Sequence, residues 1–310
     1  MKGLLCGGGT MKDIKKKNKL KVIVFGGAGF VGSHVADFLS ERGHDVIIFD
    51  IRESPYLKSN QIMIVGDILD RDAVDKAIKG CSVVYNFSGI ADIDEAIKKP
   101  VETVSYNILG NTYIMDSCVA NKVERFMYAS SLYVYSDSGS FYRSSKQACE
   151  LLLENYHKVY GLNYTIMRYG SLYGERSGEN NFIHKILKEA LVYGTITRDG
   201  DGEEIREYIH IYDAARCSVD ALDNEYNNEI VIVTGSQQIK IKDLLDMIKE
   251  MMHDNVNIKY VESKSDCHYK ITPYQFHPKI GRRMISSYYL DLGQGLLHCL
   301  SDLHKAHIKH

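Results

Sequence analysis

The segment Lys21–Gly32, which reads K-V-I-V-F-G-G-A-G-F-V-G, constrains the fold of this chain more than any other. Its first part, Val22–Phe25, is the apolar run of a buried strand, and an amphipathic segment follows the glycines. A strand, a glycine turn and a helix in this order give a dinucleotide fingerprint its structural context, whereas a bare tight turn is the alternative. We expect Gly26 to allow the turn, Gly29 to let a pyrophosphate approach, and Gly32 to let the helix pack on the strand.

A carboxylate follows the second apolar run, Val46–Phe49, in the form of Asp50. At the tip of a strand, such a carboxylate accepts hydrogen bonds from the hydroxyls of an adenosine ribose. It also repels a 2′-phosphate at close range, so NAD is expected rather than NADP. Arg52 in the following loop is the one feature that favours the phosphate.

Apolar runs alternate with helical patterns as far as residue 167. The predicted strands are 22–25, 46–49, 62–65, 83–87, 125–129 and 164–167, and the predicted helices are 30–42, 70–80, 100–122 and 142–160. This alternation predicts an α/β fold with a doubly wound parallel sheet of the Rossmann type. Ligands of such sheets bind beyond the carboxyl ends of the strands. Small or polar residues stand at these ends: Gly26, Asp50, Asp67, Ser88, Ser131 and Tyr169.

The alternation weakens beyond Gly174, where we expect a smaller, interleaved lobe over the mouth of the sheet. This region has predicted helices at 180–193, 213–222 and 241–252, predicted strands at 205–211 and 230–233, a turn-rich stretch at 194–202, and an irregular tail from 259. The predicted domains are a disordered tail at 1–19, a dinucleotide-binding domain at 20–173 plus about 205–235, and a substrate lobe at 174–204 plus about 236–310.

Composition argues against several classes of protein. The net charge is −2 and no basic stripe is sustained, so no nucleic-acid partner is expected. No apolar run approaches the roughly 18 residues that a membrane span requires. The seven cysteines are scattered and never form CxxC, which favours a reduced, cytoplasmic protein. The first nineteen residues lack the apolar core of a signal peptide.

Tyr142 and Lys146 are four residues apart on one face of a predicted helix. A phenol with a pKa of about 10 is a poor acid or base at neutral pH. A neighbouring ammonium and a positively charged nicotinamide favour the phenolate, and Ser131 at the preceding strand tip offers a second hydrogen bond to the same substrate oxygen. The set suits hydride transfer from a carbinol. Without the glycine fingerprint, an exposed helix face would be the better interpretation in a chain with 22 tyrosines.

The motifs together resemble the extended short-chain dehydrogenase/reductases, and more narrowly their sugar-nucleotide epimerase/dehydratase branch. The resemblance runs in the family's order from about residue 21 to 297. It is carried by G-G-A-G-F-V-G, Gly66-Asp67, Asn107 with Gly110, Ser130-Ser131 before Val134-Tyr135, Tyr142xxxLys146, Arg168-Tyr169 with Leu172-Tyr173-Gly174, and Arg206-Glu207-Tyr208-Ile209-His210.

The resemblance implies NAD as cofactor and a nucleotide-diphosphate sugar as substrate, bound in the smaller lobe. Ser131, Tyr142 and Lys146 would be the catalytic trio, and Ser131, Asn181 and Arg206 would contact the substrate. Asp67 would meet the adenine and Asn107 would hold the active-site helices. The expected cofactor site comprises Gly26, Gly29, Phe30, Val31, Gly32, Asp50, Asp67, Ile68, Ser88, Asn107, Tyr142, Lys146 and Tyr169. A homodimer is also expected.

Three departures from the family pattern bear on the reaction. Dehydratases and decarboxylases of this family carry an acidic residue where this chain has Leu132, and Tyr133 is expected to point to the opposite face of a continuing strand. The segment between Ser131 and Tyr142 is short, and the closing pattern at 272–281 is altered. We expect C4 epimerisation through a transient 4-keto sugar. A sugar-nucleotide reductase or dehydratase, or a regulatory protein that senses a dinucleotide, are the alternatives.

Other polar residues have structural interpretations. His304, His307 and His310 are expected on the solvated face of a terminal helix, and no metal site is expected. Cys149 is assigned to packing, and His210 to a structural hydrogen bond.

Overall fold

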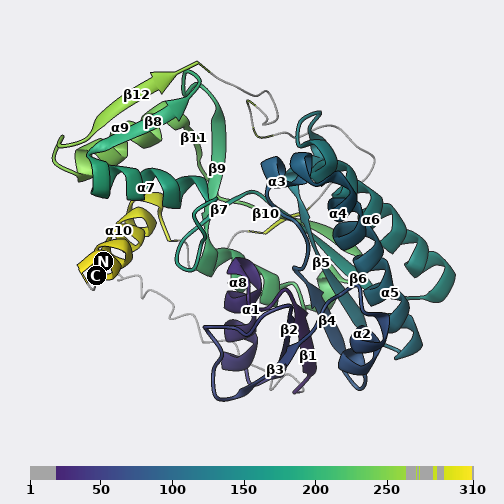
Figure 1. The fold of residues 1–310 in the computed structure, drawn as a ribbon. Helices are drawn as coiled ribbons and strands as arrows, with labels where there is room; N and C mark the ends of the chain where they lie inside the picture. The colour runs from purple at the N-terminus through teal and green to yellow at the C-terminus, as the bar shows by residue number, and fades with distance from the viewer. Residues whose placement is uncertain (1–18, 263–269, 271, 273–281, 285–289, 309–310) are drawn as a thin grey trace, which may run out of the picture.

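The computed structural model describes residues 19–262, 270, 272, 282–284 and 290–308. The predicted tail therefore lies outside the described residues except for Lys19, as does the altered closing pattern except for Thr272. A parallel sheet of eight strands forms the centre of the molecule, in the order β13-β10-β6-β5-β4-β1-β2-β3 (Figure 1). The predicted doubly wound α/β fold is thus confirmed.

The inner strands of the large sheet are buried on both faces, which explains their nearly continuous apolar runs. Val22 to Phe25, for example, have no exposed surface at all. The strands are β1 (Lys21–Phe25), β2 (Asp45–Asp50), β3 (Gln61–Val65), β4 (Val83–Asn86), β5 (Arg125–Ser131), β6 (Tyr164–Tyr169), β10 (Glu229–Val233) and β13 (Arg282–Met284). The order reverses between β1 and β4, so the carboxyl ends of these two strands flank the expected ligand crevice.

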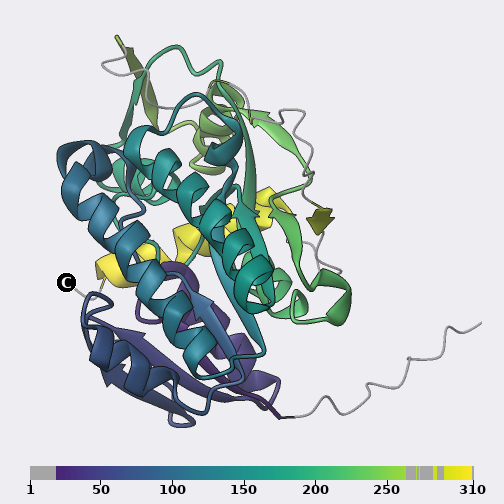
Figure 2. The same ribbon diagram turned by 90° about the vertical axis from the view of Figure 1, so that its right-hand side faces the viewer.

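Two helix layers cover the sheet. On one face α1 (Phe30–Glu41) and α8 (Ile211–Asp220) pack against β1, β4, β6 and β10 around one apolar core. On the other face a second core lies beneath three helices, which stand in front of the sheet in Figure 2. These helices are α2 (Arg71–Ile78), α5 (Asn111–Ala120) and α6 (Ser140–Tyr160).

The helix predicted over 100–122 is divided into three parts. It consists of α4 (Pro100–Val104), the π-helical segment η1 (Ser105–Gly110) and α5, and it follows the unpredicted α3 (Ile93–Lys98). Helical periodicity did not reveal the π turn, because one wide turn shifts the apolar repeat by only about one residue. The short α3 begins at Asp92, whose carboxylate accepts a hydrogen bond from the Glu95 amide at 2.7 Å.

The second lobe has its own apolar core and two small sheets. The three-stranded sheet contains β7 (Ser171–Tyr173), β9 (Ile205–His210) and β11 (Gln238–Lys240), and the two-stranded sheet contains β8 (Thr195–Asp199) and β12 (Asn257–Val261). Three helices complete this lobe: α7 (Phe182–Tyr193), α9 (Ile241–Met251) and α10 (Leu292–Ile308).

Two expectations for this lobe were wrong. The stretch at 194–202 contains β8, and the tail from 259 contains the end of β12 and the edge strand β13. The helix α10 at the end of this tail is the expected terminal helix that carries His304 and His307. Because β8 pairs with a strand some sixty residues later, no local pattern shows the partner. The domain boundaries stay a prediction. Among the described strands, β9, which lies in the range predicted for the dinucleotide-binding domain, pairs with the second-lobe strands β7 and β11. In contrast, β13, which lies in the range predicted for the substrate lobe, extends the large sheet.

Candidate active site

The glycine turn between β1 and α1 is tightly built. Gly26 has φ +71°, and a Cβ there would lie 2.6 Å from the Ser88 nitrogen. A Cβ on Gly32 would collide with the Gly26 carbonyl, whereas one on Gly29 would meet only that carbonyl, at 3.2 Å. Helix α1 begins at Gly29 without a side-chain cap, so the first amides of the helix, at Phe30 and Val31, are left for an anion.

Acidic residues line the same edge of the sheet. Asp50 ends β2, and its Oδ2 accepts a hydrogen bond from the Ala28 amide in the glycine turn at 3.0 Å. Asp67 follows β3, and its Oδ1 accepts a hydrogen bond from the Leu69 amide at 2.9 Å. The hydrogen bond from the Ala28 amide fixes the Asp50 carboxylate beside the glycine turn. The second carboxylate oxygen of Asp50, Oδ1, takes no part in it.

The loop after β4 is held by Asn107 in the π-helical segment. The Oδ1 of Asn107 accepts from the Ile90 amide at 2.7 Å, and its Nδ2 donates to the Ile90 carbonyl and to the Ser145 hydroxyl, each at 2.9 Å. Asn107 thus joins the loop to α6. Gly89, with φ +127°, is needed here because a Cβ would lie 2.5 Å from the Asn107 Oδ1. Ser88 bonds to Asn86 at the end of β4.

Tyr142 and Lys146 lie side by side on α6, as their spacing predicts. The Lys146 ammonium is 5.6 Å from the centre of the Tyr142 ring and 5.1 Å from that of Tyr128. It donates a hydrogen bond to the Ala129 carbonyl on β5 at 2.8 Å. Burial lowers the pKa of Lys146 to about 8, while the charge of Glu150 opposes this change.

Strand β5 ends at Ser131, and the backbone then turns into the 3₁₀ helix η2 (Leu132–Tyr135). The Ser131 hydroxyl accepts a hydrogen bond from the Tyr133 amide at 3.3 Å and so caps this helix. The expected direction of Tyr133 applied to a strand that continues past Ser131, and this strand does not continue. Leu132 is buried, 1% exposed, against Tyr135 and Ile232, and the Tyr133 ring faces Tyr142 at 6.1 Å.

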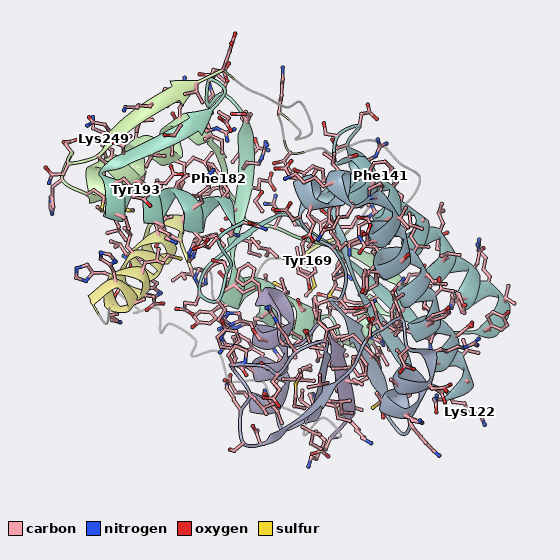
Figure 3. All side chains as sticks on the ribbon, in the orientation of Figure 1. Lys122, Phe141, Tyr169, Phe182, Tyr193 and Lys249 are labelled. Carbon is pink, nitrogen blue, oxygen red and sulfur yellow. The ribbon has the colours of Figure 1, made fainter. Side chains whose placement is uncertain are left out.

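Three predicted ligand residues have other partners in the structure. Tyr169, which is labelled in Figure 3, is buried in the core of the large sheet, and its hydroxyl bonds Ser218 on α8 at 2.6 Å. Asn181 caps α7, and its amide donates to the Leu172 carbonyl at 2.8 Å. Arg206 on β9 is buried and donates to the carbonyl of the preceding residue at 3.0 Å.

Sequence analysis missed a buried polar network behind the catalytic helix. Glu150 on α6 forms a bidentate ion pair with Arg168 on β6, with distances of 2.5 and 3.0 Å. The same carboxylate accepts from the Ser130 hydroxyl at 2.5 Å, and Arg168 donates to the Tyr135 hydroxyl at 2.5 Å. The available signal was the position of Glu150, which is four residues after Lys146 on the same helix face.

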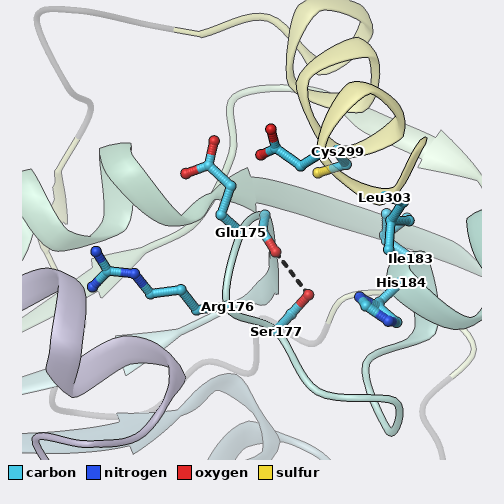
Figure 4. Close-up of a pocket in the computed structure, with 9 residues that line it drawn as sticks. Glu175, Arg176, Ser177, Ile183, His184, Cys299 and Leu303 are labelled. Carbon is cyan, nitrogen blue, oxygen red and sulfur yellow. Dashed lines mark hydrogen bonds between the residues drawn. The ribbon is translucent and has the colours of Figure 1, made fainter. Parts of the chain in front are cut away.

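A pocket of about 140 Å³ lies apart from these residues, between the loop after β7, α7 and α10 (Figure 4). It is lined by Gly174, Glu175, Arg176, Ser177, Ile183, His184, Cys299, Asp302 and Leu303. None of the predicted catalytic residues lines it, so we do not assign it to the reaction. Within the residues that the structure describes, no cluster of acidic, histidine or cysteine side chains could hold a metal ion, and no helix could cross a membrane.

The structural interpretations of the remaining polar residues agree with the structure. His210 caps α8, its Nδ1 accepting from the Tyr212 amide at 3.3 Å. The Cys149 thiol is buried and donates to the Asn107 carbonyl at 3.0 Å. His304 and His307 are exposed on α10, and His310 lies outside the described residues.

Known proteins resemble this chain in sequence and in fold. A model of the "NAD dependent epimerase/dehydratase family" matches residues 22–234. A putative UDP-glucose 4-epimerase of Methanocaldococcus jannaschii is 29% identical over 74% of this chain and 81% of its own length. A UDP-N-acetyl-alpha-D-glucosaminuronate decarboxylase of Bacillus cytotoxicus is 27% identical over 78% and 84%. The fold is that of UDP-glucuronic acid 4-epimerase from Bacillus cereus, solved with its substrate and NAD, with a TM-score of 0.82, 23% identity and coverage of 93% and 100%.

Proposed function

The chain belongs to the NAD-dependent epimerase/dehydratase family, and we propose that it is a 4-epimerase of nucleotide-diphosphate sugars that works through a transient 4-keto sugar. The observation that carries the proposal is the pairing of Tyr142 and Lys146 on α6, beside the end of β5 where Ser131 lies. The relatives named UDP-glucose 4-epimerases make UDP-hexoses the first substrates to test.

The residues at the edge of the sheet fit NAD. The glycine turn leaves no room for side chains at Gly26 and Gly32, and the uncapped start of α1 suits a pyrophosphate. The fixed Asp50 carboxylate suits the hydroxyls of an unphosphorylated ribose. When bound, NAD supplies a reversible acceptor for the hydrogen at C4 of the sugar.

The protein's own residues would move the proton. Tyr142 takes the proton from the sugar O4, and the nearby Lys146 ammonium stabilises the phenolate that does so. Burial lowers the pKa of Lys146 to about 8, but at neutral pH most protein molecules still carry this lysine in its charged form. The Ser131 hydroxyl, held at the start of η2, offers a second hydrogen bond to O4.

Epimerisation is favoured over dehydration by the surroundings of Tyr142. Eliminating water across C5–C6 needs a base for the C5 proton and an acid for the departing oxygen. Leu132 supplies neither, and its side chain is buried against Tyr135 and Ile232. Asp137 is the nearest carboxylate in sequence, but its side chain is 92% exposed and pairs with Arg143 at 3.5 Å.

The test is incubation of the protein with UDP-glucose, UDP-galactose and their N-acetyl and uronic acid analogues, followed by mass spectrometry and proton NMR. The expected product has unchanged mass, an inverted C4 and no deuterium from solvent at C5. A product lighter by one water or by carbon dioxide would contradict the proposal and assign the chain to the dehydratase or decarboxylase reactions of the family.

The substrate contacts and the assembly belong to the same proposal. We assign Asn181 and Arg206 to the nucleotide and the diphosphate, because a guanidinium can bind a diphosphate through two hydrogen bonds. A homodimer is supported by apolar side chains exposed on two neighbouring elements, Val101 and Val104 on α4 and Leu151 on α6. Light scattering measures the assembly: a mass of one chain would contradict the dimer.

We also assign the protein to the cytoplasm. The five cysteines that the structure describes are free and buried, as expected of a reduced compartment.

A further inference from the structure

The catalytic helix α6 begins without a side-chain cap. Its N-cap is Gly139, with φ +99°, and the next residue, Ser140, has φ +47°. Tyr142 is the third residue of this helix. The first amides of a helix have no partner within it, and uncapped first turns open readily. Some other contact must therefore hold Tyr142 in place.

The ring of Tyr133 supplies that contact. A Cβ on Gly139 would lie 2.6 Å from the Tyr133 ring, so the loop can only close over this ring because residue 139 is a glycine. The Tyr133 and Tyr142 rings meet edge to face, with centres 6.1 Å apart and planes at 81°. Tyr133 itself is fixed by η2, where its amide bonds Ser131 and its carbonyl accepts from the Ser136 amide at 2.9 Å.

We propose that Tyr133 is a positioning residue, whose ring holds the Tyr142 phenol next to the Lys146 ammonium. Edge-to-face contact is a preferred geometry of aromatic pairs and fixes the ring plane of the partner. The short segment between Ser131 and Tyr142 brings Tyr133 within reach. The inference rests on the proposed role of Tyr142 as acid and base.

Charged and titratable groups around Tyr142 determine what its displacement would do. Lys146 faces it from the same helix and Tyr128 lies beyond Lys146 on β5. Arg143 is the next residue along α6 and pairs with Asp137 in the loop. A phenol that moves away from the Lys146 ammonium loses stabilisation of its charged form, so its titration moves to higher pH.

The experiment measures that titration directly in the NAD-bound protein. Ultraviolet absorbance of tyrosinate is recorded against pH for the wild type, Tyr133→Phe and Tyr133→Leu, each with and without Tyr142→Phe. Subtracting each Tyr142→Phe partner isolates the Tyr142 phenol from the other tyrosines. We expect the wild type and Tyr133→Phe to agree, and Tyr133→Leu to titrate about one pH unit higher, with kcat near neutral pH reduced about tenfold.

The outcomes separate this inference from the proposed function. NAD affinity should stay unchanged in Tyr133→Leu, because the contact lies at the phenol. An unchanged Tyr142 titration in a folded Tyr133→Leu protein would overturn the inference, as would a Tyr133→Phe variant that behaves like Tyr133→Leu. If Tyr133→Leu fails to fold, Tyr133→Met serves in its place. A shifted titration in a protein that epimerises no sugar would refute the proposed function and leave the positioning role supported.

Discussion

Removing the Glu150 carboxylate should destabilise the protein strongly, because it leaves a buried charge without its partner. Glu150 and Arg168 are both buried and joined through two hydrogen bonds. Burial alone would lower the pKa of the Arg168 guanidinium, but the hydrogen bonds and charge of Glu150 more than offset this and raise it. Substitution Glu150→Leu would also leave the Ser130 hydroxyl without its acceptor.

Breaking one side of a buried ion pair costs about 3–5 kcal/mol. For a protein of this size, each kcal/mol lowers the melting temperature by about 2 °C, so Glu150→Leu should melt roughly 6–10 °C below the wild type. Differential scanning fluorimetry in the presence of NAD measures the shift. Because the network ties α6 to β5 and β6, turnover at a permissive temperature should also fall.

Two control variants make the result specific. In Glu150→Leu/Arg168→Met both charges are replaced by apolar groups, so most of the lost stability should return. In Glu179→Leu an exposed ion pair with Lys188 is removed, and the melting temperature should not change measurably. A shift below about 2 °C for Glu150→Leu, or a double variant as unstable as the single one, would refute the argument.

Three further predictions concern the cofactor site, the catalytic pair Tyr142 and Lys146, and two buried histidines. The protein should bind NAD more tightly than NADP, and Asp50→Ser should reduce the difference between the two affinities. Similar affinities of the wild type for NAD and NADP, measured by calorimetry, would contradict this. Tyr142→Phe should lose about 10²–10⁴-fold in turnover while still binding NAD, whereas Lys146→Ala should also bind NAD more weakly; more than a tenth of wild-type turnover in Tyr142→Phe would show that another group is the base. Burial lowers the pKa of His34 and of His210 to about 4. In the unfolded chain the pKa of each histidine returns to about 6.5, so between about pH 6.5 and 4 the unfolded chain binds more protons than the folded protein. The free energy of unfolding should therefore be highest above about pH 6.5 and should fall by about 1.4 kcal/mol per pH unit for each histidine as the pH decreases towards about 4. A melting temperature that is constant between pH 7 and 5 would contradict this.

Local patterns were sufficient to predict the first six strands of the large sheet, but not its edge strand β13. Each of the six is an apolar run, buried on both faces in all but the edge strand β3, and each predicted run lies within one residue of the observed strand start. The glycine turn was predictable for the same reason, because its geometry depends on residues next to one another in sequence. The pairing of β8 with β12 depends on distant residues, and the π turn at Asn107 shifts the apolar repeat by only about one residue, so neither was predicted.

The direction of Tyr133 could not be predicted from the sequence, because it depends on whether the strand continues past Ser131. In an extended strand, neighbouring side chains alternate between faces, so Leu132 and Tyr133 could not both be placed without knowing where β5 ends. Ser131 ends it, since its hydroxyl binds the Tyr133 amide and starts a 3₁₀ helix. The consequence for the reaction is that an aromatic ring, and not a carboxylate, faces the Tyr142 phenol. Such a ring can hold the phenol in place for proton transfer at O4, whereas its own hydroxyl, a phenol, is a poor base for the C5 proton at neutral pH. The turn at Ser131, which the apolar pattern of the strand does not show, therefore also favours epimerisation over elimination.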